Sequence, residues 1–497
     1  GSLVDILLGF VLIYMGTGKQ FNIRTASIYA ITGITFITAY MVANFDKVKM
    51  SSAIYRSGKY QQITPEINFI KDGKTATVAV QTQTKENGQV IRSILTNGKP
   101  DAGISYHESL YSLDEPTMAL LATYPLAAHP NAKTAAVIGL GSGLSTDTLL
   151  RSDRLQQVDT IEIEAAIVEG ARLFGPHSER AFTDPRSSIY IDDAKSFFSV
   201  NRKKYDLIIS EPSNPWVSGV SSLFTKEFYA HIKTHLNQGG ILTQWIQIYE
   251  INLDLIATII KALSNEFKYY AIYQTTSLDI VIMGSDDDKV HDLNGWVFEQ
   301  PDMMKRLTRL DLNILNDLNA RKIGDERLLS YLFDGYFSYL PANSDFFPTL
   351  DRLAPKSRFL KNTALSLMDL SYTRIPVMDF LDPDRSELGF DRYQISPANG
   401  YPTSHYQKVS ESIFRSIVSD GAISMKDWEK GLVLSVAELQ QYIHHCHISE
   451  NLTQSFQVAA ELINVYLSPE VAESFWSKIM KSDCYLKLTV QDKNFLQ

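Results

Sequence analysis

Hydrophobic and polar positions follow two alternating periods in the middle of the chain, from about residue 134 to residue 285. Short apolar runs rich in Val and Ile are each followed by a stretch in which apolar residues recur every three or four positions. The first pattern is typical of buried strands and the second of amphipathic helices. Strands are predicted at 134–138, 158–164, 187–194, 205–212, 239–249, 269–275 and 278–285. Strands that alternate with helices of this length predict a Rossmann-like α/β fold with a mostly parallel sheet covered on both faces.

A different pattern precedes this core. Residues 67–95 hold three β-rich runs with Asp-Gly and Asn-Gly turn sequences at their ends, which predicts a small antiparallel β domain over 64–115. A helix is expected from about Pro116, because proline is tolerated in the first turn of a helix. Asp114 and Glu115 lie near the expected approach to the core, where turn and capping roles explain them.

The alternation stops near residue 290. Residues 297–335 and 406–480 have helical periodicity, whereas 340–405 are rich in Pro, Asp and Ser, as in ordered loops or a linker. We therefore expect an α/β core over 116–289 and a mainly helical C-terminal extension over 290–497. This extension is expected to support the core or to provide a partner site or a homo-oligomer contact.

The N-terminus is strongly apolar. Residues 26–45 contain no charge over twenty positions, and residues 3–16 form a shorter apolar stretch with one Asp. About 20 apolar residues are needed to cross a bilayer core, so two transmembrane segments are predicted over 1–48, followed by a connector over 49–63. A single buried hairpin is the alternative. The chain begins abruptly without Met, which indicates either an added Gly1-Ser2 or the C-terminal part of a longer membrane protein.

Charge and cysteine content give predictions about the location of the protein, its partners and its disulfides. Basic residues after the second apolar segment predict a cytoplasmic catalytic domain, against which Lys19 and Arg24 on the opposite loop count. The protein is expected to be an integral protein of the bacterial inner membrane. The net charge of −9 argues against a nucleic-acid partner. The two cysteines, Cys446 and Cys484, imply no disulfide framework; one disulfide between them is an alternative, but reduced surroundings fit better. No metal site is predicted, because the cluster at 444–447 lacks a second ligand pair at zinc spacing.

A glycine-rich loop follows the first core strand, in the sequence TAAVIGLGSGLS. Gly139, Gly141 and Gly143 lie between this strand and the next helix, where glycine lets the backbone approach a nucleotide-like ligand closely. Leu144 breaks the spacing of a dinucleotide-binding loop, and no phosphate-binding lysine follows.

Acidic residues occupy the ends of the next three strands. Glu162 or Glu164 ends the second, Asp193 the third and Glu211 the fourth. A carboxylate about twenty residues after the glycines can accept hydrogen bonds from ribose hydroxyls. Ligands of such sheets bind beyond the carboxyl ends of the strands. The three positions together therefore predict an adenosine-type ligand.

At residues 65–285 the chain resembles the polyamine aminopropyltransferases (spermidine synthases), and more closely their membrane-fused branch. The resemblance rests on the small β unit, DEP-TMALLATYPLAAHP, GLGSG, IEIE, DDA, SEPSNPW, LFTKEFY and GGILTQWIQIYE, in this order. A stretch after the core, NSDFFPTL, resembles a motif of the fused branch. The resemblance implies transfer of an aminopropyl group from decarboxylated S-adenosylmethionine to an amine, with release of methylthioadenosine and without a metal.

The resemblance also assigns roles to residues. Glu162 resembles the ribose-binding acid, Asp193 the acid that contacts adenine, and Glu211 occupies the place of the catalytic aspartate. Gly139, Gly141, Ser142 and Gly143 correspond to the donor-binding loop, and Asn214, Gln244, Trp245 and Tyr249 to the substrate pocket.

Two departures keep other functions open. The family usually has an aspartate where this chain has Ser142, and a second one where it has Asn214. The first holds the amine end of the decarboxylated donor and the second helps hold the diamine. The loss of charge at Ser142 also allows ordinary S-adenosylmethionine as the donor. A methyltransferase or a cleaving or cyclising enzyme is therefore one alternative. A catalytically inactive, membrane-tethered binding or scaffolding protein is another. The acceptor is expected to be a small amine or an amine on a protein or lipid.

Overall fold

The structure is a computed structural model of the 497-residue chain. It describes residues 2–16, 23–42, 51, 65–85, 88–108, 110–285, 287, 292–365, 367, five residues between 410 and 418, 430–449 and 452–488. Most of the predicted connector at 49–63 and of the Pro- and Asp-rich segment after residue 367 lie outside the described residues.

An eight-stranded sheet forms the centre of the core. Its strand order is β12-β10-β11-β9-β8-β5-β6-β7, in which β7, β6, β5, β8 and β9 are parallel. The other three strands, β11, β10 and β12, pair antiparallel. The strands are β5 (Thr134–Ile138), β6 (Gln157–Glu162), β7 (Ser187–Ile191), β8 (Tyr205–Ser210), β9 (Leu236–Gln247), β10 (Tyr269–Gln274), β11 (Asp279–Ser285) and β12 (Lys322–Asp325). The predicted Rossmann-like, mostly parallel sheet is confirmed.

Helices cover both faces of this sheet because side chains alternate along each strand. Ala136 and Ile138 of β5 pack into one buried cluster, and Ala135 and Val137 into the other. The first cluster includes α9 (Ala194–Val200), α10 (Lys226–Lys233) and α11 (Leu253–Ser264). The second includes α5 (Asp114–Ala128), α6 (Leu144–Leu150) and α12 (Pro301–Arg309). The remaining core helices are α7 (Ala165–Ala171), η1 (Arg172–His177), α8 (Arg180–Thr183) and η2 (Val220–Phe224).

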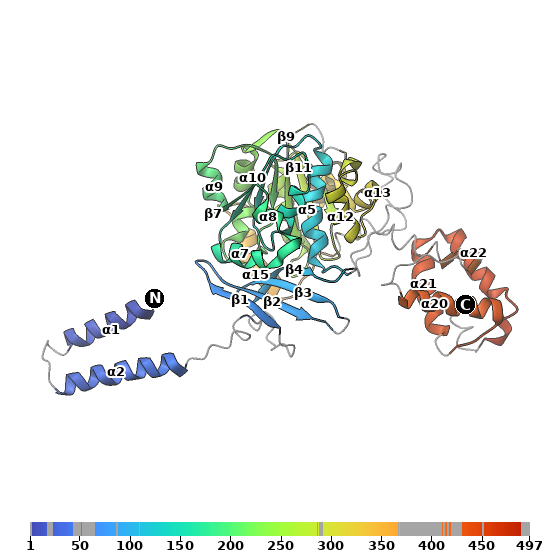
Figure 1. Ribbon diagram of the computed structural model, residues 1–497. Helices are drawn as coiled ribbons and strands as arrows, with labels where there is room; N and C mark the ends of the chain where they lie inside the picture. Colours follow the sequence, from blue (N-terminus) through green and yellow to red (C-terminus); the bar gives the residue numbers. More distant parts are fainter. Residues whose placement is uncertain are drawn as a thin grey trace.

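The predicted antiparallel β domain is a four-stranded sheet in the order β1-β2-β3-β4. Its strands are β1 (Glu66–Asp72), β2 (Thr77–Thr84), β3 (Val90–Thr96) and β4 (Lys99–Ser105). It packs on α7 and lies at one end of the core, below it in Figure 1. Val78, Ile94 and Ile104 bury one face of this sheet against Ala166 and Phe174 of the core.

The region after residue 290 differs in part from its helical prediction. It contains η3 (Gly295–Phe298), α12, α13 (Leu315–Asn319), α14 (Glu326–Ser330), the π-helical turn η4 (Tyr331–Tyr336) and α15 (Thr349–Phe359). Between α13 and α14, however, the four residues of β12 add an edge strand to β10. A strand this short carries too few alternating positions to be recognised beside a helix.

The first two helices correspond to the predicted membrane segments. They are α1 (Ser2–Gly16) and α2 (Ile23–Val42), and apolar side chains such as Leu12, Met15 and Ile31 are exposed on them. Within the described part of the chain, no helix combines the length and hydropathy needed to span a membrane.

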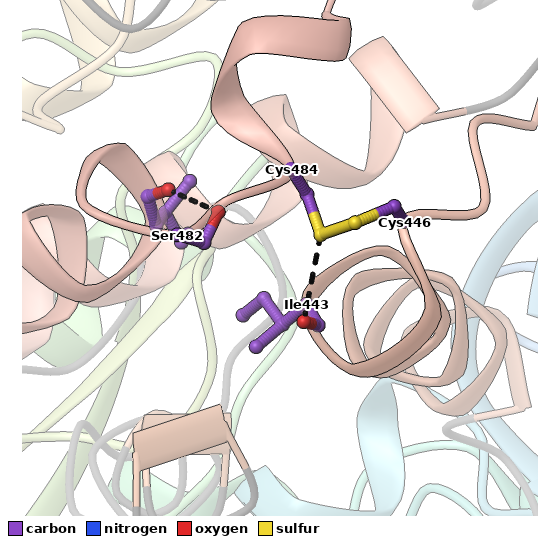
Figure 2. The surroundings of a disulfide bond; sticks show 5 residues. Ile443, Cys446, Ser482 and Cys484 are labelled. Carbon is purple, nitrogen blue, oxygen red and sulfur yellow. Dashed lines mark hydrogen bonds between the residues drawn. A yellow bond between two sulfur atoms is a disulfide. The ribbon is translucent and has the colours of Figure 1, made fainter.

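The C-terminal helices form a cluster with its own buried core. They are α20 (Lys430–His445), α21 (Leu452–Tyr466), α22 (Pro469–Met480) and the short η7 (Tyr485–Lys487). A disulfide joins Cys446 to Cys484, and the Sγ of Cys484 lies 3.7 Å from the carbonyl oxygen of Ile443 (Figure 2). The expectation of reduced cysteines is therefore wrong. Tertiary packing brings together two residues 38 positions apart, which their spacing alone does not indicate.

Candidate active site

A cavity of about 790 Å³ lies at the carboxyl edge of the parallel strands, between the core and the small sheet. This volume is within the range of small-molecule binding sites. Its lining comes from β4, the start of α5, the glycine loop, the ends of β6, β7 and β8, the segment after β9, the start of β11 and residues 361 and 363. The predicted residues that line it are Gly139, Gly141, Glu162, Asp193, Glu211, Trp245 and Tyr249.

Glycine is required where the loop meets the next strand. Gly139 has a φ of 93°, and a Cβ there would lie 2.4 Å from the backbone oxygen of Glu211. Gly143 has a φ of 85° and immediately precedes α6. These positive φ values are costly for any other residue. The loop thus lies directly against the end of β8 and brings Gly139 next to the backbone of Glu211.

Glu162 holds the glycine loop in place. Its Oε2 accepts a hydrogen bond of 2.9 Å from the amide of Leu140, and its Oε1 accepts one of 2.9 Å from the amide of Glu164. Burial raises the pKa of Glu162 to about 7, and these two amides oppose the increase. Each carboxylate oxygen retains a further lone pair for a ligand hydroxyl. This geometry fits the predicted ribose contact.

Two further acidic residues near the glycine loop, Glu164 and Asp193, have different roles. Glu164, the alternative to Glu162, caps α7 and also accepts hydrogen bonds from the amide and hydroxyl of Thr75, which lies between β1 and β2 of the small sheet. Asp193 caps α9 through the amide of Ser196 at 2.9 Å and also lines the cavity. Glu164 therefore connects the two sheets, while Asp193 faces the space predicted for adenine.

Glu211 follows β8 and lies in the cavity wall. Its Oε2 accepts a hydrogen bond of 2.5 Å from the hydroxyl of Ser145 on α6. Burial raises the pKa of Glu211 to about 7; the bond from Ser145 lowers it, and the charges of Asp279 and Asp114 raise it. A carboxyl group with this pKa can accept a proton near neutral pH.

Four predicted site residues lie behind the lining rather than in it: Ser142, Gly143, Asn214 and Gln244. Ser142 is buried, and its hydroxyl points to the sulfur of Met118 at 3.2 Å. Asn214 donates to the hydroxyl of Tyr249 at 3.2 Å, and Gln244 donates to the carbonyls of Ser210 and Trp245. Asn214 and Gln244 thus support the aromatic wall formed by Trp245 and Tyr249.

Several acidic residues that line the cavity are absent from the predicted site, among them Asp279 and Asp114. Asp279 is the first residue of β11 and Asp114 the first of α5, and both line the cavity. Burial and the charge of Asp279 raise the pKa of Asp114 to about 7. Burial also raises the pKa of Asp279. The missed signal at Asp279 is an acid that begins a strand and is followed directly by four apolar residues, Ile280 to Met283.

The site contains acids and aromatic rings but few cations. Lys99 and Lys361 line the cavity, and Lys99 is paired with Asp101 at 2.6 Å. Among the described residues, no group of His, Cys, Asp or Glu has an arrangement suited to a metal ion. The arrangement favours a positively charged ligand with a nucleoside part.

Residues 117–283 match the spermine/spermidine synthase domain. Over 151 residues the chain is 35% identical to the polyamine aminopropyltransferases of Yersinia pestis (strain Pestoides F) and Yersinia pseudotuberculosis serotype O:1b (strain IP 31758). This alignment covers 30% of the chain and 51% of each relative, so the chain spans about half the length of the curated relatives that it matches. The matched residues lie within the α/β core. This match confirms the resemblance that the motifs predict.

Two solved structures align with the chain at low sequence identity and low TM-score. The spermidine synthase of Thermotoga maritima aligns with 45% of this chain and 75% of its own, at 18% identity and a TM-score of 0.39. A probable spermidine synthase of Corynebacterium glutamicum aligns with 56% of this chain and 96% of its own, at 16% identity and a TM-score of 0.40.

Proposed function

We propose that this protein transfers an aminopropyl group from decarboxylated S-adenosylmethionine to an amine. The observation that carries the proposal is Glu211, a carboxylate beside the glycine loop, in the wall of a cavity that Glu162 and Asp193 also line. The match of residues 117–283 to the spermine/spermidine synthase domain supports this reaction. Glu162 and Asp193 then bind the ribose and adenine of the donor.

The reaction requires a base and an aligned nucleophile. An ammonium group has no free electron pair, so the acceptor first gives a proton to the carboxylate of Glu211. The freed electron pair attacks the carbon next to the sulfonium, a new C–N bond forms, and the C–S bond breaks. The bonding electrons remain on sulfur and methylthioadenosine leaves as a neutral thioether. Trp245 and Tyr249 present aromatic faces to the cations.

Glu211 is one methylene longer than the aspartate of the family. Misplacement of a reacting group by about 1 Å can cost roughly a hundredfold in rate. In this chain Gly139 lies against the backbone of Glu211, and Ser145 hydrogen-bonds to its carboxylate. Both ends of the longer side chain are therefore held in place. This local support is consistent with a glutamate as the base.

The test is methylthioadenosine release from decarboxylated S-adenosylmethionine in the presence of an amine. The Glu211→Gln variant should lose turnover by at least about a hundredfold, the lower range for general base catalysis. It should still bind methylthioadenosine in calorimetry, because Glu162 and Asp193 are unchanged. Turnover at the wild-type rate in this variant would remove Glu211 as the base.

S-adenosylmethionine chemistry is the second candidate, and Ser142 favours it. This position carries no charge and is buried against Met118, so the loop adds no carboxylate that would repel the carboxylate of the ordinary donor. S-adenosylhomocysteine as product would indicate methyl transfer, and methylthioadenosine formed without an amine would indicate cleavage. Binding without any product would indicate the inactive, scaffolding alternative.

We also propose that residues 1–48 attach the protein to a membrane. Exposed apolar side chains on α1 and α2, including Leu12, Ile31 and Ile34, support this attachment. A variant lacking residues 1–45 should be released from the membrane fraction of expressing cells. If it stays in that fraction, another segment is the anchor.

A further inference from the structure

The helix α15 has one buried face and one exposed face. Leu350 and Ala354 are fully buried and belong to the same apolar cluster as α11, against which the helix packs. The exposed side includes Arg352, Leu353, Lys356, Phe359 and Leu360. Residues three, four and seven positions apart lie on one side of a helix, so these side chains share a face that points away from the core.

Bulky apolar side chains are exposed on this face and directly before it. Phe359 is 85% exposed and Leu360 is 56% exposed. Phe346 and Phe347, which precede the helix, are 79% and 72% exposed. Single exposed apolar residues need no explanation, but several that gather in one segment are typical of an interaction surface.

The same segment is basic within an acidic chain. Residues 346–361 contain four basic residues and one acidic residue, whereas the whole chain has a net charge of −9. Arg358 is paired with Glu250 at 3.8 Å. Among the described residues, no ion pair includes any of the other three bases of this segment. Their charges are therefore available to an anionic partner.

Exposed bases beside exposed apolar side chains match the surface of an anionic lipid bilayer. Phe and Leu side chains enter the boundary between headgroups and acyl chains, while Lys and Arg contact the lipid phosphates. An acidic polypeptide would suit the charges of Arg352 and Lys356. A lipid surface accommodates these charges and also removes Phe359 and Leu360 from water, so the observations favour lipid.

We propose that the exposed face of α15, together with Phe346 and Phe347, docks on a membrane that contains anionic lipids. This contact is separate from the proposed attachment through residues 1–48 and does not depend on the proposed reaction. A few bases and apolar side chains give reversible binding, so the contact orients an attached protein rather than anchoring it. Lys361 and Thr363, just after the helix, line the cavity, and docking therefore brings this part of the cavity wall close to the lipid headgroups.

The test is acetylation of lysines in the full-length protein, quantified by mass spectrometry in the presence of vesicles. Lys356 should react at least about fivefold more slowly with vesicles of phosphatidylcholine and phosphatidylglycerol than with phosphatidylcholine alone, since each base near an anionic surface contributes about this factor. Lys305 is the internal reference, because it is exposed on α12, which packs on the opposite face of the core sheet. Its rate should be equal with the two kinds of vesicle.

Variants of the full-length protein identify the side chains that make the contact. Combining Phe359→Ser with Leu360→Ser should remove most of the protection of Lys356. Arg352→Gln should weaken this protection by about fivefold, because one charge is lost. Ile314→Ser is the matched control, since it removes an exposed apolar side chain just before α13, and it should leave the protection unchanged.

Equal acetylation of Lys356 with the two kinds of vesicle would overturn the proposal, and so would full protection in the variant that lacks Phe359 and Leu360. Soluble polyglutamate is tested in place of the vesicles. Protection by polyglutamate as strong as that by the anionic vesicles would also overturn the proposal, because an acidic polypeptide would then suffice. No turnover is measured, so failure of the proposed reaction would leave these results unchanged.

Discussion

The hydroxyl of Ser145 donates a 2.5 Å hydrogen bond to the carboxylate of Glu211. Ser145 belongs to the first turn of α6, directly after the glycine loop, whereas Glu211 follows β8. The bond favours the ionised carboxylate and so lowers the pKa of Glu211, against the larger effect of burial. The glycine loop and the candidate base are thus connected electrostatically as well as by contact.

Removing this hydrogen bond should change the pH dependence of turnover. In Ser145→Ala the pKa of Glu211 should rise above its value of about 7, because a group that stabilises the ionised form is lost. A general base must be deprotonated, so the acidic limb of the kcat/KM profile should move to higher pH. At pH 6 we expect a loss of about threefold to tenfold. An acidic limb at the wild-type position would show that Glu211 does not control it.

The buried carboxyl groups should also affect thermal stability. Burial raises the pKa values of Asp114, Glu162 and Glu211 to about 7, so between about pH 4.5 and 7 the folded chain binds more protons than the unfolded chain. These groups therefore make stability fall as the pH rises through this window. Melting temperatures of the wild type and Glu211→Gln should diverge between pH 4.5 and 7, with the variant becoming relatively more stable. A constant difference would contradict the raised pKa.

A buried ion pair holds the C-terminal extension on the core. Arg306 of α12 donates to Asp147 of α6 at 3.0 Å and to the carbonyl of His177, and its side chain is 3% exposed. Arg306→Met should lower the stability by about 3 kcal/mol, because it leaves part of a buried charge network unpaired. Arg180→Met removes an exposed pair with Asp302 and should cost under about 1 kcal/mol. Denaturant midpoints of the two variants measure the difference, and equal shifts would contradict this role for Arg306.

Much of the site could be predicted because parallel strands end at one edge of a sheet. Gly139, Glu162, Asp193 and Glu211 each lie at or just after the end of a parallel strand, so their order along the chain predicts that they meet at the cavity. Asp279 could not be placed in this way, because it begins a strand whose direction is reversed. Sequence alone does not reveal which strands at the edge of a mixed sheet turn back.

The sequence also could not predict the directions of the side chains within the glycine loop. The positive φ values of Gly139, Gly141 and Gly143 turn the intervening Ser142 away from the cavity and toward Met118. The resemblance assigns this position to donor binding, a role that remains a prediction. Such a turn depends on backbone angles that glycine permits but does not specify.

The disulfide between Cys446 and Cys484 gives a prediction about the C-terminal helices. Closing a loop of 38 residues stabilises a fold by about 4 kcal/mol in the chain-entropy model. Replacing both cysteines with serine should make α20 to α22 more sensitive to proteolysis, with methylthioadenosine binding by the core unchanged. Equal proteolysis rates would contradict a stabilising disulfide.

The same disulfide also tests the predicted cytoplasmic location of the catalytic domain. Structural disulfides persist in oxidising compartments and are rare in the cytosol. Thiol trapping in intact cells, followed by mass spectrometry of peptides containing Cys446 and Cys484, should recover the linked pair. Recovery of both cysteines as free thiols from fresh cells would instead place the C-terminal helices in a reducing compartment.

The isolated antiparallel β-bridge between Tyr249 and Thr363 shows which part of the chain is needed to complete the cavity. Thr363 and Lys361 line the cavity although they follow α15, well beyond the end of the matched domain at residue 283. A fragment that stops at residue 283 would leave the wall beside Tyr249 open to water and would also lose Arg306. Truncation, inhibitor screening or transplantation of this site into another scaffold should therefore keep the chain through residue 365.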